Sequence, residues 1–317
     1  MKFKPSLFLI LILFVSVNSF SQKVITTKQQ PDTIPHWTRK NSLGFDISQI
    51  AFVNWSAGGT SSVSGLLKGN FYRIYVSNHS IWVNELIARY GMNKQDGIEL
   101  RKTDDVLKFN STFGHRTDTL SNWYHTAKFN FNTQFTNGYA YPNTDLAISK
   151  PFAPAYIFLG VGAENANKEK KWTLYLSPLT FKTTFVLDQR LANQGSFGVK
   201  AAVYDINGVL ITEGKKTKVE LGCFVSSYFK KELFKNINLE NRISLYSDYL
   251  NDFGNIDVDW DMQWVLVVNQ YVNANIGIHT IYDDDIKTKK EVDGVQVTEG
   301  PRLQLKQSLG VGLLYTF

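Results

Sequence analysis

A serine and a histidine with the spacing of a hydrolase pair are the first candidates for chemistry. Ser111 and His125 lie in two neighbouring segments of alternating polar and apolar residues, 102–115 and 122–136. If the chain turns near Asp118, Ser111 lies directly across from His125 on the apolar face of a hairpin. A histidine that removes the hydroxyl proton lets serine attack an ester, as a phospholipase built on a lipid-facing surface requires. No third, orienting residue is evident, and the alternative interpretation is an interfacial histidine among aromatic side chains.

An acidic triplet is the second candidate. Asp283, Asp284 and Asp285 offer carboxylate oxygens, which are the ligands that Ca²⁺ prefers, although the spacing of an EF-hand loop is absent. The alternative interpretation is a solvated acidic loop. Four histidines, His36, His79, His115 and His279, show no metal-ligand spacing. We therefore expect no cofactor, and a metal only as the alternative at this triplet.

Charged residues recur on one face of the alternating segments. A closed sheet would direct this face toward its interior, where both signs of charge can line a water-filled pathway or form ion pairs that close it. Both alternatives stay open, and nothing in the sequence specifies a solute. The predicted lumen-lining residues are Glu85, Arg89, Lys108, Lys128, Lys182, Glu220, Glu240, Arg242, Asp259, Asp261, Arg302 and Lys306.

The elements that must position these residues are strands, and the last segment shows this most clearly. In residues 301–317 one parity is apolar and ends on Tyr315 and Phe317, whereas the other parity is mostly polar or glycine. Successive side chains of a strand point to opposite faces, so the segment has one face suited to lipid. A long strand that ends the chain on an aromatic residue is typical of the closing strand of an outer-membrane barrel.

About twelve such strands are predicted. They form an all-β, transmembrane, antiparallel up-and-down β-barrel, closed by the C-terminal strand that ends in Phe317. Near Pro178 the alternation changes parity, which predicts a bulge. The strands lie near 43–53, 62–76, 81–93, 102–115, 122–136, 153–163, 171–187, 216–231, 236–250, 256–270, 273–284 and 301–317.

The connections between these strands mostly alternate in length, as periplasmic turns and outer loops do in bacterial barrels. The shorter gaps are 77–80, 116–121, 164–170, 232–235 and 271–272. The longer gaps are 54–61, 94–101, 137–152, 188–215 and 285–300, with 251–255 as a short exception. An even strand number of twelve places both termini on the periplasmic side.

The N-terminal residues indicate export. A basic start, an apolar run from Ser6 to Val17 and small residues before Gln22 have the layout of a signal peptide. We expect three parts: a signal peptide, 1–21, a flexible periplasmic leader, 22–41, and a single outer-membrane barrel domain, 42–317. The predicted location is the outer membrane of a Gram-negative bacterium.

Composition narrows the partners. Without Lys2 and Lys4 the formal charge falls from +6 to about +4, which suits a surface among anionic lipid head groups and is no indication of nucleic-acid binding. After the signal peptide no apolar run approaches the length of a spanning helix. The expected partners are outer-membrane lipids and lipopolysaccharide, the barrel-assembly machinery that reads the C-terminal strand, and a protein of an outer-membrane complex. The connection at 188–215 is long enough either to fold over the opening of the barrel or to dock such a protein.

Several short motifs, taken in order, resemble one family. They lie at 54–59, 101–105, 134–139, 153–156, 177–178 and 197–198. Together they resemble an uncharacterised family of outer-membrane β-barrel proteins known only as a domain of unknown function, over residues 43–317. The resemblance implies the barrel and its compartment, and the family has no established activity. We therefore expect a non-enzymatic barrel, either a narrow channel or a structural accessory subunit, with the lipid-face hydrolase as the alternative.

Overall fold

The computed structural model describes residues 36–50, 60–167, 170–251, 253–292 and 295–317. The predicted signal peptide, 1–21, and the motif at 54–59 lie outside these residues, as does most of the predicted leader. They stay predictions.

Twelve antiparallel strands form one closed barrel, in the order β1-β18-β15-β14-β13-β12-β9-β8-β5-β4-β3-β2. The fold class and the number of barrel strands predicted from the sequence are confirmed. Closure pairs β1 with both β2 and β18, so the barrel has no open edge with unpaired backbone groups. The barrel strands are β1 (His36–Ile50), β2 (Ser62–Val76), β3 (Ser80–Gln95), β4 (Ile98–His115), β5 (Trp123–Thr133), β8 (Ala155–Asn167), β9 (Trp172–Phe185), β12 (Thr217–Phe234), β13 (Ile237–Asp248), β14 (Asp257–Val267), β15 (Val272–Tyr282) and β18 (Gln304–Thr316).

The outer face is apolar, and β18 shows why the sequence alternates. Leu305, Leu309, Val311 and Leu313 are each more than half exposed, and so are Tyr315 and the terminal Phe317. On the opposite parity, Gly312 faces Asp46 of β1 inside the barrel. Exposed leucine and valine in this continuous arrangement need hydrocarbon around them rather than water.

Many strand ends differ by a few residues from the predicted ones, and two differences change the pairing or a connection. Strand β1 starts at His36 rather than near 43, because residues 36–41, which we expected in the leader, pair with residues 71–76 of β2. The predicted longer connection at 94–101 is wrong. Gln95 pairs with Ile98, and only Asp96 and Gly97 connect β3 to β4. Gly97 has a φ of 75°, and Asp-Gly is a strong signal for this two-residue turn.

The predicted bulge near Pro178 is confirmed. The register of β9 shifts between Ser177 and Thr180 against β12, and between Leu176 and Leu179 against β8. As a result, Tyr175 and Lys182, which have different parity, both lie on the inner side, where Tyr175 contacts Phe224 and Lys182 contacts Glu220. The bulge also removes the need for a ladder hydrogen bond from the proline.

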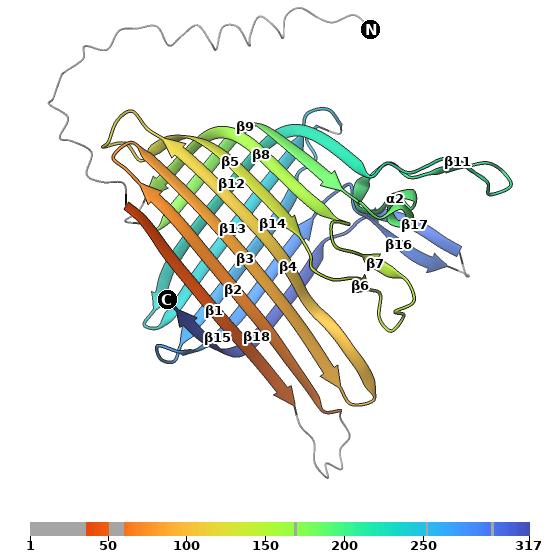
Figure 1. Ribbon diagram of the computed structural model, residues 1–317, viewed down its shortest axis with the longest axis horizontal. Coiled ribbons are helices and arrows are strands. Elements are labelled where there is room, and N and C mark those ends of the chain that lie inside the picture. Colours follow the sequence, from red (N-terminus) through yellow and green to blue (C-terminus); the bar gives the residue numbers. More distant parts are fainter. Residues whose placement is uncertain (1–35, 51–59, 168–169, 252, 293–294) are drawn as a thin grey trace, which may run out of the picture. The chain divides into compact units, whose positions relative to one another are not determined.

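The longer connections gather at one end of the barrel (Figure 1), which we call the mouth. They carry the hairpins β6 (Gly138–Tyr139)–β7 (Ala147–Ser149), β10 (Val203–Tyr204)–β11 (Leu210–Thr212) and β16 (Lys287–Val292)–β17 (Val295–Pro301), together with α2 (Gln189–Asn193) and η1 (Ser196–Gly198). A small apolar core lies here and is made by Ala153, Val186, Leu191, Ala192 and Val199. None of the helices in the described residues has the length and apolar character needed to cross a membrane.

Candidate functional site

An ion pair crosses the barrel interior from wall to wall. Arg242 Nη1 of β13 lies 3.7 Å from Glu85 Oε2 of β3. These two strands are on opposite sides of the ring, with five strands between them in either direction. The two side chains therefore meet near the middle of the lumen and narrow it at this level.

Glu85 is held by several donors besides Arg242. Asn110 Nδ2 donates to its Oε2 at 2.9 Å, and the Tyr72 hydroxyl donates to its Oε1. Only 6% of Glu85 is exposed, and the Tyr228 ring lies 5.4 Å from the Arg242 guanidinium carbon. A buried carboxylate with this many donors is satisfied without a ligand.

A second contact crosses the lumen between β4 and β18, which are four strands apart in the ring. Lys306 Nζ lies 2.9 Å from Asp104 Oδ1, and Arg89 Nε lies 3.2 Å from Asp104 Oδ2. On the adjacent wall Lys68 Nζ lies 2.6 Å from Asp46 Oδ2. Ion pairs between different sets of strands therefore lie at several places in the interior.

Aromatic side chains fill the other side of the interior. Phe158, Tyr175, Phe224 and Tyr246 form a connected set of ring contacts with centroids about 6 Å apart. Lys128 Nζ lies 4.2 Å from the centre of the Tyr175 ring and 2.6 Å from Glu164 Oε2. One side of the interior therefore carries paired charges, and the other carries aromatic rings together with the Lys128–Glu164 pair.

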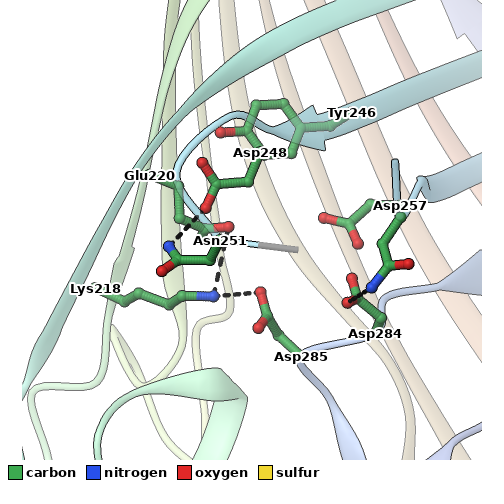
Figure 2. Close-up of a pocket in the computed structure, with 9 residues that line it drawn as sticks. Lys218, Glu220, Tyr246, Asp248, Asn251, Asp257, Asp284 and Asp285 are labelled. Atoms are coloured by element: carbon green, nitrogen blue, oxygen red, sulfur yellow. Dashed lines mark hydrogen bonds and ion pairs between the residues drawn. The ribbon is translucent and has the colours of Figure 1, made fainter. Parts of the chain in front are cut away.

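A third group of charges lies at the mouth, and we call it the mouth cluster. Figure 2 shows six of its members, Lys218, Glu220, Asp248, Asp257, Asp284 and Asp285. Lys182 Nζ lies 2.7 Å from Asp257 Oδ2, 3.6 Å from Glu220 Oε1 and 3.7 Å from Asp283 Oδ2. Lys218 lies 3.5 Å from Glu220 Oε1 and also pairs with Asp285. The cluster consists of Lys182, Lys218, Glu220, Asp248, Asp257, Asp283, Asp284 and Asp285.

The residues predicted to line the lumen occupy the following places. Six of them take part in the contacts above, Glu85, Arg89, Lys128, Lys182, Glu220 and Arg242, and Lys306 completes the pair with Asp104. Asp259 accepts a hydrogen bond from His279 at 2.7 Å, Asp261 accepts one from Gln263 at 3.2 Å, and Glu240 pairs with Lys230. Lys108 lies opposite Asn132, and Arg302 is an exposed residue before β18.

Sequence reasoning missed Asp46, Lys68, Glu164 and Tyr72 among the interior residues. Alternation along β1, β2 and β8 was the available signal. The run Arg101-Lys102-Thr103-Asp104-Asp105 predicts a self-neutralising cluster of these charges at the rim of the barrel. Lys102 does pair with Asp105 at 2.8 Å, but Asp104 pairs with Arg89 and Lys306 instead. Neighbouring residues of a strand point to opposite faces, so Asp104 and Asp105 do not share partners.

Ser111 and His125 are not brought together. In the register of β4 and β5, Ser111 lies opposite Phe129, and His125 lies opposite His115. The two are four positions apart along the hairpin, roughly 13 Å at the rise of a strand. Ser111 Oγ donates to Asn84 Oδ1 at 2.8 Å and accepts from Trp82 Nε1 at 2.9 Å, so its partners are on β3. The expected face-to-face pair is therefore absent.

The acidic triplet does not act as one unit. Asp285 pairs with Lys218, whereas Asp283 and Asp284 lie beside Asp257 of β14. Asp257 is the first residue of β14, and the pairing of Val258 with Tyr282 in the β14–β15 hairpin places it beside Asp283 and Asp284.

The connection between β9 and β12 is anchored to the connection before β8. Asp188 accepts from the Leu191 backbone N at 3.0 Å as the N-cap of α2, and Lys150 Nζ lies 2.6 Å from its Oδ2. Partial burial opposes ionisation, but the hydrogen bonds from Lys150 and Leu191 outweigh it and hold the pKa of Asp188 below its usual range. Arg190 also donates to the Ala147 carbonyl.

Comparison with known proteins adds a family of unknown function. Residues 47–139 match the model described as Protein of unknown function (DUF3078). This match confirms the resemblance to an uncharacterised family, over less than a third of the chain rather than over residues 43–317. No curated protein matches the chain.

The chain is also similar to solved outer-membrane barrels. The COG4313 outer membrane channel from Pseudomonas putida F1 is 9% identical, with a TM-score of 0.40, over 92% of this chain and 99% of that chain. The translocator domain of autotransporter NalP from Neisseria meningitidis is 10% identical, with a TM-score of 0.38, over 88% of each chain. At these scores the assignment of the fold depends on the strand pairing and the apolar outer face described above. The chain is an outer-membrane type β-barrel.

Proposed function

We propose that this barrel is a narrow outer-membrane channel whose lumen is closed to free diffusion by paired charges. The contact between Glu85 and Arg242 supports this more than any other observation, because it joins opposite walls. A lumen of about twelve strands is small enough for long side chains to fill. Ion pairs that cross it act as a barrier that opens when the pairs separate.

The chemistry of the lining favours small ions over large solutes. Charges of both signs are paired at short distances, such as 2.6 Å between Lys128 and Glu164 and 2.9 Å between Lys306 and Asp104. An ion that enters can exchange with one member of a pair, whereas an uncharged solute must separate the pair without replacing its partner. We therefore expect low conductance and no passage of sugars or peptides.

Single-channel recording in planar bilayers tests the barrier. We expect wild-type protein to show small, brief openings, and the double variant Glu85→Ala/Arg242→Ala to show several-fold larger conductance because the wall-to-wall contact is gone. The matched control is Lys94→Ala/Glu99→Ala, which also removes one charge of each sign but acts on exposed residues of the β3–β4 hairpin. The control should conduct like the wild type.

Two outcomes would contradict the proposal. Large, steady wild-type openings would mean that the lumen is a general pore rather than a barrier. Equal conductance of the wild type and the double variant would mean that Glu85 and Arg242 do not limit the passage.

A structural accessory subunit is the second candidate. The mouth connections have an apolar core of their own, in which Ala153, Val186, Leu191 and Ala192 are almost fully buried. A folded platform of this kind can dock a protein of an outer-membrane complex, in addition to the surrounding lipid and lipopolysaccharide. Purification in mild detergent at native expression tests this, and a clean monomer would count against it.

A further inference from the structure

The mouth cluster places three carboxylates from two separate segments around one point. Asp257 is the first residue of β14, and Asp283 and Asp284 follow β15. Each can offer one oxygen such that the three oxygens lie within 4.8 Å of one another. Nitrogen and sulfur ligands are missing from this group, so it suits a hard cation that takes oxygen ligands.

Buried oxygens without partners line the adjoining cavity. Glu220, 2% exposed, and Tyr246, 4% exposed, each have a side-chain oxygen, Oε2 and OH respectively, with no hydrogen-bond partner in the described residues. Asp257 Oδ1 is a third such atom. All three residues line one cavity, and the Tyr246 hydroxyl points toward Glu220 and Asp248 (Figure 2). Native proteins rarely bury oxygens without a hydrogen-bond or metal partner. We therefore expect a bound group in this cavity to be the partner of these oxygens.

The size and charge of the cavity fit a single ion. Its volume is about 20 Å³, room for one body the size of a water molecule. Among the side chains that the structure describes, the ion pairs made by the six carboxylates of the mouth cluster involve two ammonium groups, those of Lys182 and Lys218. Like charges this close repel one another in a partly buried setting, and a divalent cation removes much of that repulsion.

The existing hydrogen bonds leave ligand atoms available. Lys182 contacts Oδ2 of Asp257 and leaves Oδ1 unpaired. Asn255 Nδ2 donates to Asp284 Oδ2 at 2.7 Å, and the Asp285 backbone N donates to Asp283 Oδ1 at 2.9 Å. These bonds orient the carboxylates in the way that outer partners orient metal ligands.

We propose that the mouth cluster binds one Ca²⁺ through Asp257, Asp283 and Asp284. Ca²⁺ accepts irregular sets of six to eight oxygens, whereas Mg²⁺ demands a near-octahedral set that the three carboxylates of these two segments do not prearrange. The bound ion would fasten the start of the β15–β18 connection to the wall at β14. The proposal does not depend on whether the lumen conducts.

Calorimetric titration of the full mature chain tests the site. The protein is refolded into detergent from inclusion bodies, so that no lipopolysaccharide is present to bind Ca²⁺, and is stripped with EDTA. We expect one Ca²⁺ per chain, with binding weaker by about tenfold or more in Asp284→Asn and in Asp257→Asn. The matched control is Asp96→Asn, which removes the same charge from an exposed turn at the mouth and should bind like the wild type.

A second measurement keeps the test independent of variant folding. The wild-type barrel should unfold at a higher temperature in Ca²⁺ than in EDTA, and Mg²⁺ should give a smaller shift. Absence of saturable binding by the wild type, or wild-type affinity in both Asp284→Asn and Asp257→Asn, would overturn the site. Equal shifts with Ca²⁺ and Mg²⁺ would overturn the preference for Ca²⁺.

Discussion

At the scale of the residue, Glu85 is the acceptor that connects three strands inside the barrel. Tyr72, Asn110 and Arg242 all direct a donor at its carboxylate. Replacing it would leave these donors without their shared acceptor. The same carboxylate therefore contributes both to the proposed barrier and to the stability of the barrel.

We predict that Glu85→Ala lowers the free energy of unfolding by about 1–3 kcal/mol, because buried donors lose their acceptor. Urea unfolding in detergent, followed by the mobility of folded and unfolded barrel in gels, measures the change. Glu99→Ala removes the same charge from an exposed position in β4 and should leave stability unaltered. If the free energy of unfolding of Glu85→Ala equalled that of the wild type, water would replace the contacts of Glu85 without a cost in stability, and the prediction would be wrong.

At the scale of the element, the bulge in β9 constrains the strand beside it. A Cβ atom on Gly162 of β8 would lie 2.0 Å from the Leu176 carbonyl oxygen and 2.8 Å from Ser177 Cα, which are backbone atoms of the bulge. Only glycine allows β8 and β9 to approach this closely. The bulge at Pro178 and the glycine at 162 therefore form one structural feature.

We predict that Gly162→Ala lowers the free energy of unfolding by about 1–3 kcal/mol, as overpacking against backbone does, and reduces the yield of folded barrel. Gly310→Ala in β18 is the control, since its nearest neighbour would be Asp46 Cβ at an ordinary 3.4 Å. Folding yield in outer membranes and urea unfolding measure both variants. Equal behaviour of the two would mean that β8 shifts away from the bulge without penalty.

At the scale of the whole molecule, stability depends on hydrocarbon around the apolar outer face. Leu309 is 72% exposed on the outer side of β18, and its neighbour Ser308 has the opposite parity. In a water-soluble protein, replacing an exposed leucine with arginine has little effect. In a membrane barrel the same change transfers a charge from water into lipid.

We predict that Leu309→Arg costs about 2–4 kcal/mol, as charged residues do on the lipid face near the middle of the membrane. Ser308→Arg, one residue away and directed inward, should cost much less because the guanidinium remains in the polar interior. Unfolding in lipid vesicles compares the two. A larger cost for Ser308→Arg than for Leu309→Arg would contradict the assignment of the inner and outer faces.

The class of the protein follows from the pattern of its residues alone. Alternation along each strand depends only on the two-residue period of the backbone, so the lipid-facing parity of β18 and the parity change at Pro178 could be predicted. The ends of the strands were predicted less accurately than their faces. The Asp96–Gly97 turn was not predicted, and β3 and β4 are longer than the predicted strands.

Which residues contact one another depends on strand register and on closure of the barrel. Register placed Ser111 opposite Phe129 rather than His125, and it placed Asp257 beside Asp283 and Asp284. Closure of the ring brought Arg242 to Glu85. Alternation tells which face a side chain occupies, but not which side chain it meets across the lumen. That partnership depends on the stagger of the strands and the diameter of the closed barrel, which only the complete set of strand pairings determines.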